Sequence, residues 1–208
     1  MPISVLIADD HALFRSGLRQ LLADELGATR VREADTFDAA VDILTEEAHD
    51  LVLIDLSMPG MAGSETLAAL RDAFPSAKVA VVSATEERSE ILAALAAGVH
   101  GFVPKSLPAA EIAAALRAVT EGRIFVPATI GKRAAAPAPP RGAPAATVEG
   151  LTARQKDVLG ELMKGKASKE IARTLDIAEG TVKIHLAAIY RALGVRTRAE
   201  AIATLSRA

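Results

Sequence analysis

Short apolar runs alternate with longer stretches of helical periodicity in the N-terminal part of the chain. Residues 4–8, 51–54 and 79–83 are almost continuously apolar, as in strands that are buried on both faces of a sheet. Between these runs, apolar residues recur three and four positions apart, as in helices that cover a sheet. This alternation predicts an α/β fold, a doubly wound five-stranded parallel sheet. The other expected strands are 30–33 and 101–103, and the expected helices are 12–25, 38–47, 65–74, 89–97 and 108–120.

The C-terminal part of the chain has a different pattern, which predicts four short helices. Thr152 and Gln155 have the spacing of a capping box at the start of the first helix, and Gly165 is placed to end it. Ser168 is expected to cap the second helix. The second and third helices, joined by a tight turn, predict an all-α helix-turn-helix domain, in which the third helix enters the major groove of DNA. The buried stripe expected on this third helix consists of Val182, Leu186, Ile189 and Leu193.

A stretch rich in proline and alanine separates the two patterns. Residues 132–146 (KRAAAPAPPRGAPAA) contain four prolines and no large apolar side chain that would anchor them. This composition predicts a semi-rigid linker, and a long ordered surface loop is the alternative. We therefore expect one domain at 1–125, a linker at 126–147 and a second domain at 148–208.

The two expected domains carry opposite charge, which the net charge of −2 for the whole chain conceals. Residues 1–131 hold 10 Lys and Arg against 19 Asp and Glu, a balance of −9, whereas residues 147–208 hold 11 against 7, a balance of +4. The basic balance makes nucleic acid a candidate partner of the second domain. The absence of cysteine excludes disulfides and a thiol nucleophile. No apolar run approaches the length of a membrane span and no signal peptide is evident, so we expect a cytoplasmic protein.

Polar side chains follow four of the expected strands. Asp9 and Asp10 follow the first strand, Asp55 follows the third, Ser83 ends the fourth and Lys105 follows the fifth. The carboxyl ends of parallel strands lie at one edge of a sheet, where ligands bind. Crowded carboxylates favour a hard cation such as Mg²⁺. The set would let an aspartate accept a phosphoryl group whose oxygens are held by a lysine and a serine.

At these residues the chain resembles the receiver domain of two-component response regulators. The resemblance covers about residues 1–125 and rests on the acidic pair at 9–10, the run DLSMPGMAG at 55–63 and the segment GFVPKS at 101–106. It implies that Asp55 is the phosphoacceptor and that its phosphorylation is a charge switch. The implied Mg²⁺ ligands are Asp9, Asp10, Asp55 and the backbone carbonyl of Ser57. The implied switch and phosphate-binding residues are Ser83, Lys105 and Phe102, and a core role explains Phe102 equally well.

Residues 151–203 are similar to the LuxR-type helix-turn-helix domain, above all in the run EGTVKIHLAAIYRALGV at 179–195. With the receiver-like domain and the linker, they resemble the NarL/FixJ class of response regulators, transcription factors driven by a sensor histidine kinase. The resemblance implies a homodimer in the active state, in which the final helix contributes a contact. It implies base contacts by Lys183 and Ile184, and contacts to the DNA backbone by Lys169, Thr181 and Arg191.

Two positions depart from the family pattern. Ala178 stands where a serine often caps the recognition helix, and such a loss typically costs about 1 kcal/mol. Ala187 stands where many members have a lysine on the face toward the groove. Both departures bear on DNA affinity and not on the fold.

These patterns predict a response regulator whose DNA binding is controlled by Mg²⁺-dependent phosphorylation of Asp55. The alternative is a regulator that is independent of phosphorylation and whose receiver serves only as an interaction module. A phosphatase with an aspartate nucleophile is a weaker rival, because such enzymes usually carry two aspartates as DxD after the first strand, whereas Asp9 and Asp10 are adjacent. We expect no enzymatic activity beyond self-phosphorylation from small phosphodonors and autodephosphorylation.

Overall fold

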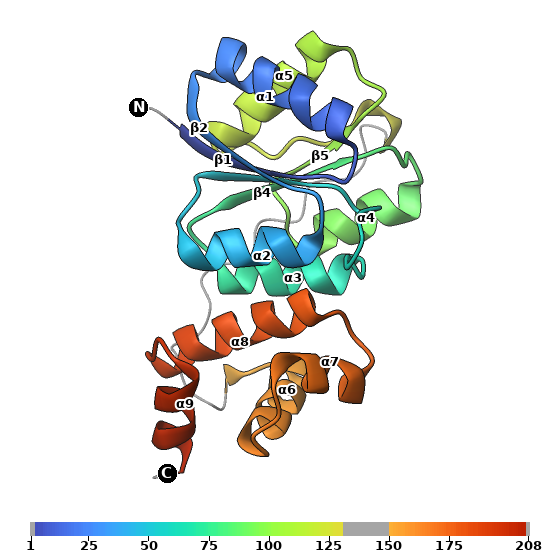
Figure 1. Cartoon of the computed structure of the whole chain (residues 1–208). Helices are drawn as coiled ribbons and strands as arrows, with labels where there is room; N and C mark the ends of the chain where they lie inside the picture. Colours follow the sequence, from blue (N-terminus) through green and yellow to red (C-terminus); the bar gives the residue numbers. More distant parts are fainter. Residues whose placement is uncertain (1–2, 131–149, 207–208) are drawn as a thin grey trace.

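The computed structural model describes residues 3–130 and 150–206. Figure 1 shows the N-terminal domain, a sheet with helices on both sides, above the C-terminal helices. The strands are β1 (Ile3–Ala8), β2 (Ala28–Ala34), β3 (Leu51–Ile54), β4 (Lys78–Ser83) and β5 (Gly101–Pro104). The helices of the same domain are α1 (Ala12–Leu26), α2 (Phe37–Glu46), α3 (Ser64–Ala73), α4 (Arg88–Ala96), α5 (Ala109–Thr120) and the short η1 (Ala128–Ile130). The C-terminal helices are α6 (Ala153–Met163), α7 (Ser168–Leu175), α8 (Glu179–Leu193) and α9 (Arg198–Leu205).

The described residues confirm the expected sheet. Its five strands are parallel and lie in the order β2-β1-β3-β4-β5. Helices α1 and α5 cover one face, and α2, α3 and α4 cover the other (Figure 1). The strand order reverses beside β1 and β3, so the carboxyl ends of these strands form the crevice in which doubly wound proteins bind ligands.

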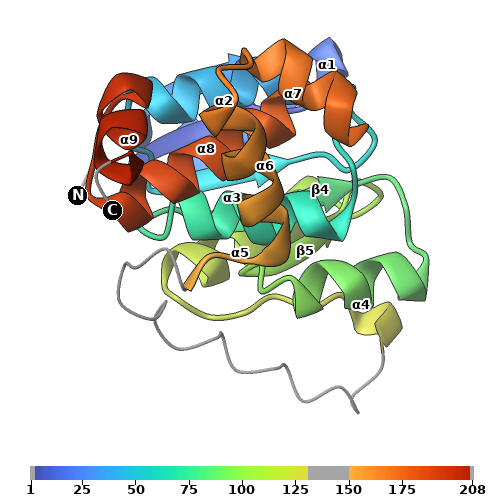
Figure 2. The ribbon, with the colours of Figure 1, turned by 90° about the horizontal axis from the view of Figure 1, so that it is seen from below.

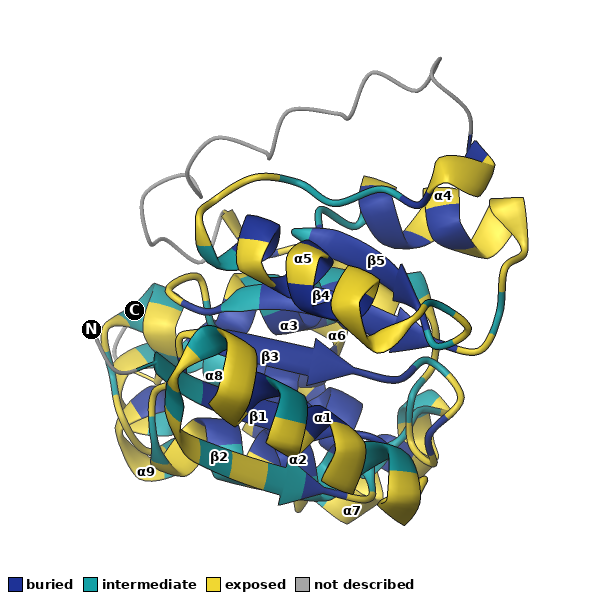
Figure 3. Cartoon of the chain, turned by 90° about the horizontal axis from the view of Figure 1, so that it is seen from above, coloured by how far each residue is buried: buried dark blue, intermediate teal, exposed yellow. Residues whose placement is uncertain are grey.

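Apolar side chains fill both sides of the sheet, and a separate core holds the C-terminal helices together. Leu6, Val81 and Phe102 belong to the core beneath α2 to α4, whereas Leu53 and Leu116 belong to the core beneath α1 and α5. Figure 3 shows the central strands as buried and the outer helix faces as exposed. The third core contains Val158, Leu162, Ile171, Val182, Leu186 and Ile189, which includes most of the stripe expected on α8.

Local signals at helix ends are confirmed in part. The capping box of Thr152 and Gln155 is present, and Gly165 follows α6 with a φ of +82°, a left-handed conformation that favours glycine. Ser168 is not a cap: it is the first residue of α7, and Glu170 accepts the backbone N–H of Ala167 instead. The first helix of this domain therefore begins where expected, whereas the second begins one residue earlier and has a different cap.

The chain after α5 continues along the N-terminal domain. Phe125 forms a bridge with Gly101, Ile130 is buried, and its carbonyl accepts a hydrogen bond from Arg88. The expected linker stretch at 132–146 lies outside the described residues, and the domain boundaries stay predictions. None of the described helices has the length and apolar character that crossing a membrane requires.

Candidate functional site

The carboxyl ends of β1, β3 and β5 bring three of the expected side chains into direct contact. The ammonium of Lys105 lies 2.8 Å from Asp55 Oδ2 and 2.7 Å from Asp9 Oδ2. Both carboxylates are almost fully buried, at 1% exposed each. Two buried carboxylates repel each other unless a positive charge lies between them, and Lys105 supplies that charge.

The environment keeps Lys105 charged. Burial by itself lowers the pKa of its ammonium, but hydrogen bonds to Asp55 and Asp9 outweigh burial, and the pKa lies above its usual value. The ring of Phe14 adds a cation–π contact, with its centroid 4.8 Å from Nζ. An anion that approaches Asp55 therefore meets a permanent positive charge.

The same edge offers a set of ligand atoms for a metal ion. Asp9, Asp10, His11 and Asp55 each present one ligand atom, and these atoms lie within 4.8 Å of one another. Asp10 and His11 are exposed, and His11 Nδ1 lies 2.7 Å from Asp10 Oδ1. Carboxylate oxygens are the preferred ligands of hard divalent cations, so the residues present fit such an ion.

Backbone and side-chain hydrogen bonds hold this edge in place. The N–H of Ser57 donates to Asp55 Oδ1 at 3.1 Å, and the N–H of Lys105 donates to the carbonyl of Ser83 at 2.8 Å. Arg15 Nη1 donates to the carbonyl of Asp9 at 2.6 Å. Arg15 does not stand out in the sequence; its place one turn into the helix that follows the acidic pair is the available signal.

The two expected switch residues lie on neighbouring strands and are fully buried. Ser83 ends β4, and its Oγ accepts the backbone N–H of Thr85 at 3.4 Å, a long and weak bond. Phe102 lies on β5 and packs in the core beneath α2 to α4. Its ring therefore occupies a core position in this structure.

Helix α8, which contains most of the expected DNA contacts, packs across α2 and α3 of the N-terminal domain (Figures 1 and 2). Ile184 is fully buried and Ala188 is 3% exposed, and both belong to the core of the N-terminal domain. Thr181 is also buried. The face of α8 that the sequence assigns to the DNA groove is thus covered by the other domain.

Polar contacts from α2 and α3 meet the same face. Asp38 Oδ1 accepts the backbone N–H of Gly180 at 2.6 Å, and Asp42 Oδ1 accepts Lys183 Nζ at 2.6 Å. Arg191 donates to the carbonyl of Asp72 on α3. Lys169 on α7 is exposed. The two aspartates of α2 do not stand out in the sequence, although their spacing of four residues puts them on one helix face.

Asp38 supplies the N-terminal cap of α8 that the alanine at position 178 cannot provide. Ala178 is the N-cap residue of α8 and forms no side-chain cap. A carboxylate at the N-terminus of a helix satisfies a free N–H and interacts favourably with the helix dipole. The approach is close, because a Cβ on Gly180 would lie 2.3 Å from Asp38 Oδ1 and the carboxylate would have to turn away. The N-terminal domain therefore caps α8 from outside.

Two family models match separate parts of the chain. Residues 5–117 match the model of the response regulator receiver domain. Residues 149–205 match the model of bacterial regulatory proteins of the luxR family.

Similar proteins cover nearly the whole chain. The glycerol metabolism activator of Pseudomonas putida is 36% identical over 206 residues, 95% of this chain and 92% of the relative. The nitrate/nitrite response regulator protein NarP of Escherichia coli is 36% identical over 204 residues, 96% of this chain and 93% of the relative. RcsB from Salmonella enterica serovar Typhimurium, in a structure bound to a promoter, has the same fold, with a TM-score of 0.58, 23% identity and 98% coverage of both chains. The chain therefore belongs to the response regulators that join a receiver domain to a LuxR-family DNA-binding domain.

Proposed function

We propose that the chain is a phosphorylation-controlled transcription regulator, in which a sensor histidine kinase transfers a phosphoryl group to Asp55. The observation that carries the proposal is Lys105, whose ammonium lies 2.8 Å from Asp55 and 2.7 Å from Asp9. A carboxylate oxygen of Asp55 attacks phosphorus, the bond from phosphorus to the imidazole nitrogen of the donor breaks, and the imidazole leaves with the electron pair. Lys105 is placed to pair with the phosphate oxygens that result.

We propose that the cation of this site is Mg²⁺, held by Asp9, Asp10, Asp55 and the backbone carbonyl of Ser57. The oxygen-rich donor set favours a hard cation over softer transition metals. Bound Mg²⁺ supplies positive charge that screens the phosphoryl oxygens from the carboxylates. The contribution of the chain is to hold the carboxylates at one edge and to keep Lys105 charged beside them.

Ser83 and Phe102 are the proposed switch residues. The bond from the N–H of Thr85 to Ser83 Oγ is 3.4 Å long, so the hydroxyl loses little when it turns to a phosphate oxygen. Phe102 lies on β5, which contacts α4; α4 contacts α3, and α3 contacts α8. A rearrangement at Phe102 would thus reach the DNA-binding domain through α4 and α3, which are packed against each other.

We propose that α8 reads DNA and that the described arrangement is the form that does not bind it. Lys183 and Ile184 would meet base edges, and Lys169, Thr181 and Arg191 would meet phosphates. In this arrangement Ile184 is fully buried and Lys183 pairs with Asp42, so DNA reaches α8 only after the domains separate. Phosphorylation would act by shifting the population toward the separated form.

The active form is proposed to be a homodimer in the cytoplasm, where a DNA-binding regulator meets its operator. Helix-turn-helix proteins commonly bind paired half-sites as symmetric dimers, which supports the proposal. Ile202 and Leu205 of α9 are half-buried and are candidate contacts between the two copies. The proposed domains are the receiver at 1–125, the linker at 126–147 and the DNA-binding domain at 148–208.

Incubation with acetyl phosphate and Mg²⁺ followed by intact-protein mass spectrometry tests this function. We expect one added phosphoryl group in the wild type and in Asp24→Asn, whose carboxylate is exposed on α1, and none in Asp55→Asn. A phosphoryl group on Asp55→Asn would overturn the assignment. Equal DNA footprints for phosphorylated and unphosphorylated protein would favour the regulator that is independent of phosphorylation, and turnover of phosphate monoesters beyond one equivalent would favour a phosphatase.

A further inference from the structure

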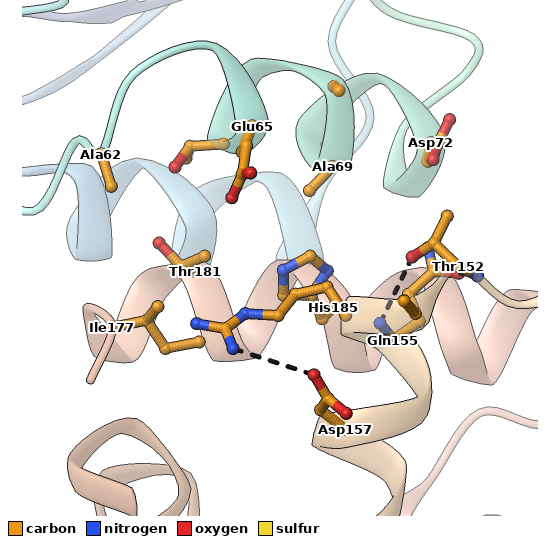
Figure 4. Close-up of a pocket in the computed structure, with 14 residues that line it drawn as sticks. Ala62, Glu65, Ala69, Asp72, Thr152, Gln155, Asp157, Ile177, Thr181 and His185 are labelled. Carbon is orange, nitrogen blue, oxygen red and sulfur yellow. Dashed lines mark hydrogen bonds and ion pairs between the residues drawn. The ribbon is translucent and has the colours of Figure 1, made fainter. Parts of the chain in front are cut away.

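A pocket of about 420 Å³ lies between the two domains, within the size range of sites for small molecules. Figure 4 shows Glu65, Ala69 and Asp72 of α3 on one side and Thr181 and His185 of α8 on the other. The start of α6 contributes a third wall. Because the walls come from both domains, the pocket exists only while the domains are packed together.

Three residues that line this pocket each have a buried side-chain polar atom without a hydrogen-bond partner in the described part of the chain. The atoms are Thr66 Oγ1, Thr181 Oγ1 and His185 Nδ1, on side chains that are 1%, 5% and 6% exposed. A buried polar group without a partner costs about 1–3 kcal/mol. Three such atoms on facing helices of different domains indicate that a guest supplies the missing hydrogen bonds.

The charges around the pocket indicate what kind of guest fits. Asp157 lies 3.9 Å from Arg154, whereas Glu65 and Asp72 form no ion pair with any described residue. Burial lowers the pKa of His185, so the imidazole is neutral at pH 7 and one of its two ring nitrogens is an acceptor. Two unpaired carboxylates, two hydroxyl oxygens and an imidazole nitrogen make a site rich in acceptors and negative in charge.

We propose that this pocket binds a small organic cation with several N–H donors, such as an alkyl diamine. One ammonium pairs with Glu65 at the mouth, and N–H groups donate to the hydroxyl oxygen of Thr181 and to His185 Nδ1. A ligand that binds only the packed arrangement stabilises it by RT ln(1 + [L]/Kd). The guest would therefore hold α8 against the receiver and oppose its release to DNA.

Calorimetric titration of the full-length protein with putrescine at 150 mM salt tests the proposal, with 1,4-butanediol as an uncharged probe of matched length. We expect saturable binding of one putrescine per chain and at least tenfold weaker binding of the diol. Glu65→Gln and His185→Gln should each weaken putrescine binding at least tenfold. Glu90→Gln, an exposed carboxylate on α4 outside the pocket, should leave it unchanged.

Hydrogen exchange provides a second readout. It is done without DNA, because diamines also bind DNA. Putrescine should raise the protection of the α8 amides in the wild type and not in Glu65→Gln. No saturable binding up to 10 mM would mean that the pocket holds only water and would overturn the proposal. Equal weakening by Glu65→Gln and Glu90→Gln would also overturn it, because binding would then be diffuse attraction to an acidic surface.

Discussion

Gly180→Ala should release the DNA-binding domain from the receiver. An ideal Cβ at this position lies 2.3 Å from Asp38 Oδ1, 3.1 Å from Phe37 Cδ1 and 3.2 Å from Asp38 Cα. The Asp38 carboxylate can turn away only by giving up its 2.6 Å hydrogen bond to the N–H of residue 180, and Phe37, the other close neighbour, is fully buried. Overpacking of this kind costs roughly 1–3 kcal/mol, which is about 5- to 150-fold in the ratio of packed to separated forms.

The helix itself should not suffer from the substitution. Gly180 is the second residue of α8, and any difference in helix propensity between glycine and alanine there applies to both forms. The strain is therefore confined to the packed form. We expect the unphosphorylated variant to bind promoter DNA more tightly than the wild type, by up to the factor above.

Fluorescence anisotropy with a labelled promoter fragment measures the increase in DNA affinity, and urea unfolding checks that the domains remain folded. Gly160→Ala is the matched control, because Gly160 lies within α6 of the same domain and a Cβ there meets no atom within 4 Å. Unchanged DNA affinity in Gly180→Ala, or an equal gain in Gly160→Ala, would refute the reasoning that the receiver covers the recognition helix.

Three further outcomes are expected. Burial lowers the pKa of His185 in the packed form, so that form has its full stability above the ordinary pKa of 6.5 and loses stability as the pH falls below 6.5. DNA affinity, measured by anisotropy, should therefore rise from pH 7.5 to pH 5.5 in the wild type, and should rise less in His185→Gln. Phe102→Ala should destabilise the receiver by about 3–5 kcal/mol in urea unfolding, because the ring is fully buried, and a cost below 1 kcal/mol would contradict that packing. Asp42→Asn should change DNA affinity less than Gly180→Ala does, because the pair with Lys183 is partly exposed and such pairs contribute about 0.2–1 kcal/mol.

The sequence by itself determined the fold of each domain. Continuous apolar runs predict strands that are buried on both faces, and such strands require covering helices. The hydrophobic pattern therefore predicts the order of strands and helices. The structure extends β2 to Ala28–Ala34, beyond the expected 30–33, because pairing with β1 runs from Ala28 to Ala34. Pro108, expected in the first turn of α5, is instead its N-cap residue.

The sequence also predicts which side chains lie at the carboxyl edge of the sheet. Asp9, Asp55 and Lys105 each follow a strand, and the carboxyl ends of parallel strands lie at one edge, so the sequence predicts that the three meet there. That Lys105 contacts both carboxylates is a finding of the structure. Arg15, by contrast, holds Asp9 from a helix surface, where sequence position says little about what a long side chain reaches.

Only the tertiary structure decided how the two domains meet. The apolar and basic face of α8 suits either DNA or a second protein surface, and a pattern of side chains cannot distinguish the two. The carboxylates of Asp38 and Asp42 take the place of an anionic partner, and the missing cap at Ala178 is supplied from the other domain. These contacts join residues that are 142 and 141 positions apart in the sequence, so local sequence preferences cannot predict them. Hydrophobic periodicity thus specifies what each domain is, whereas long-range packing specifies which face of α8 is available.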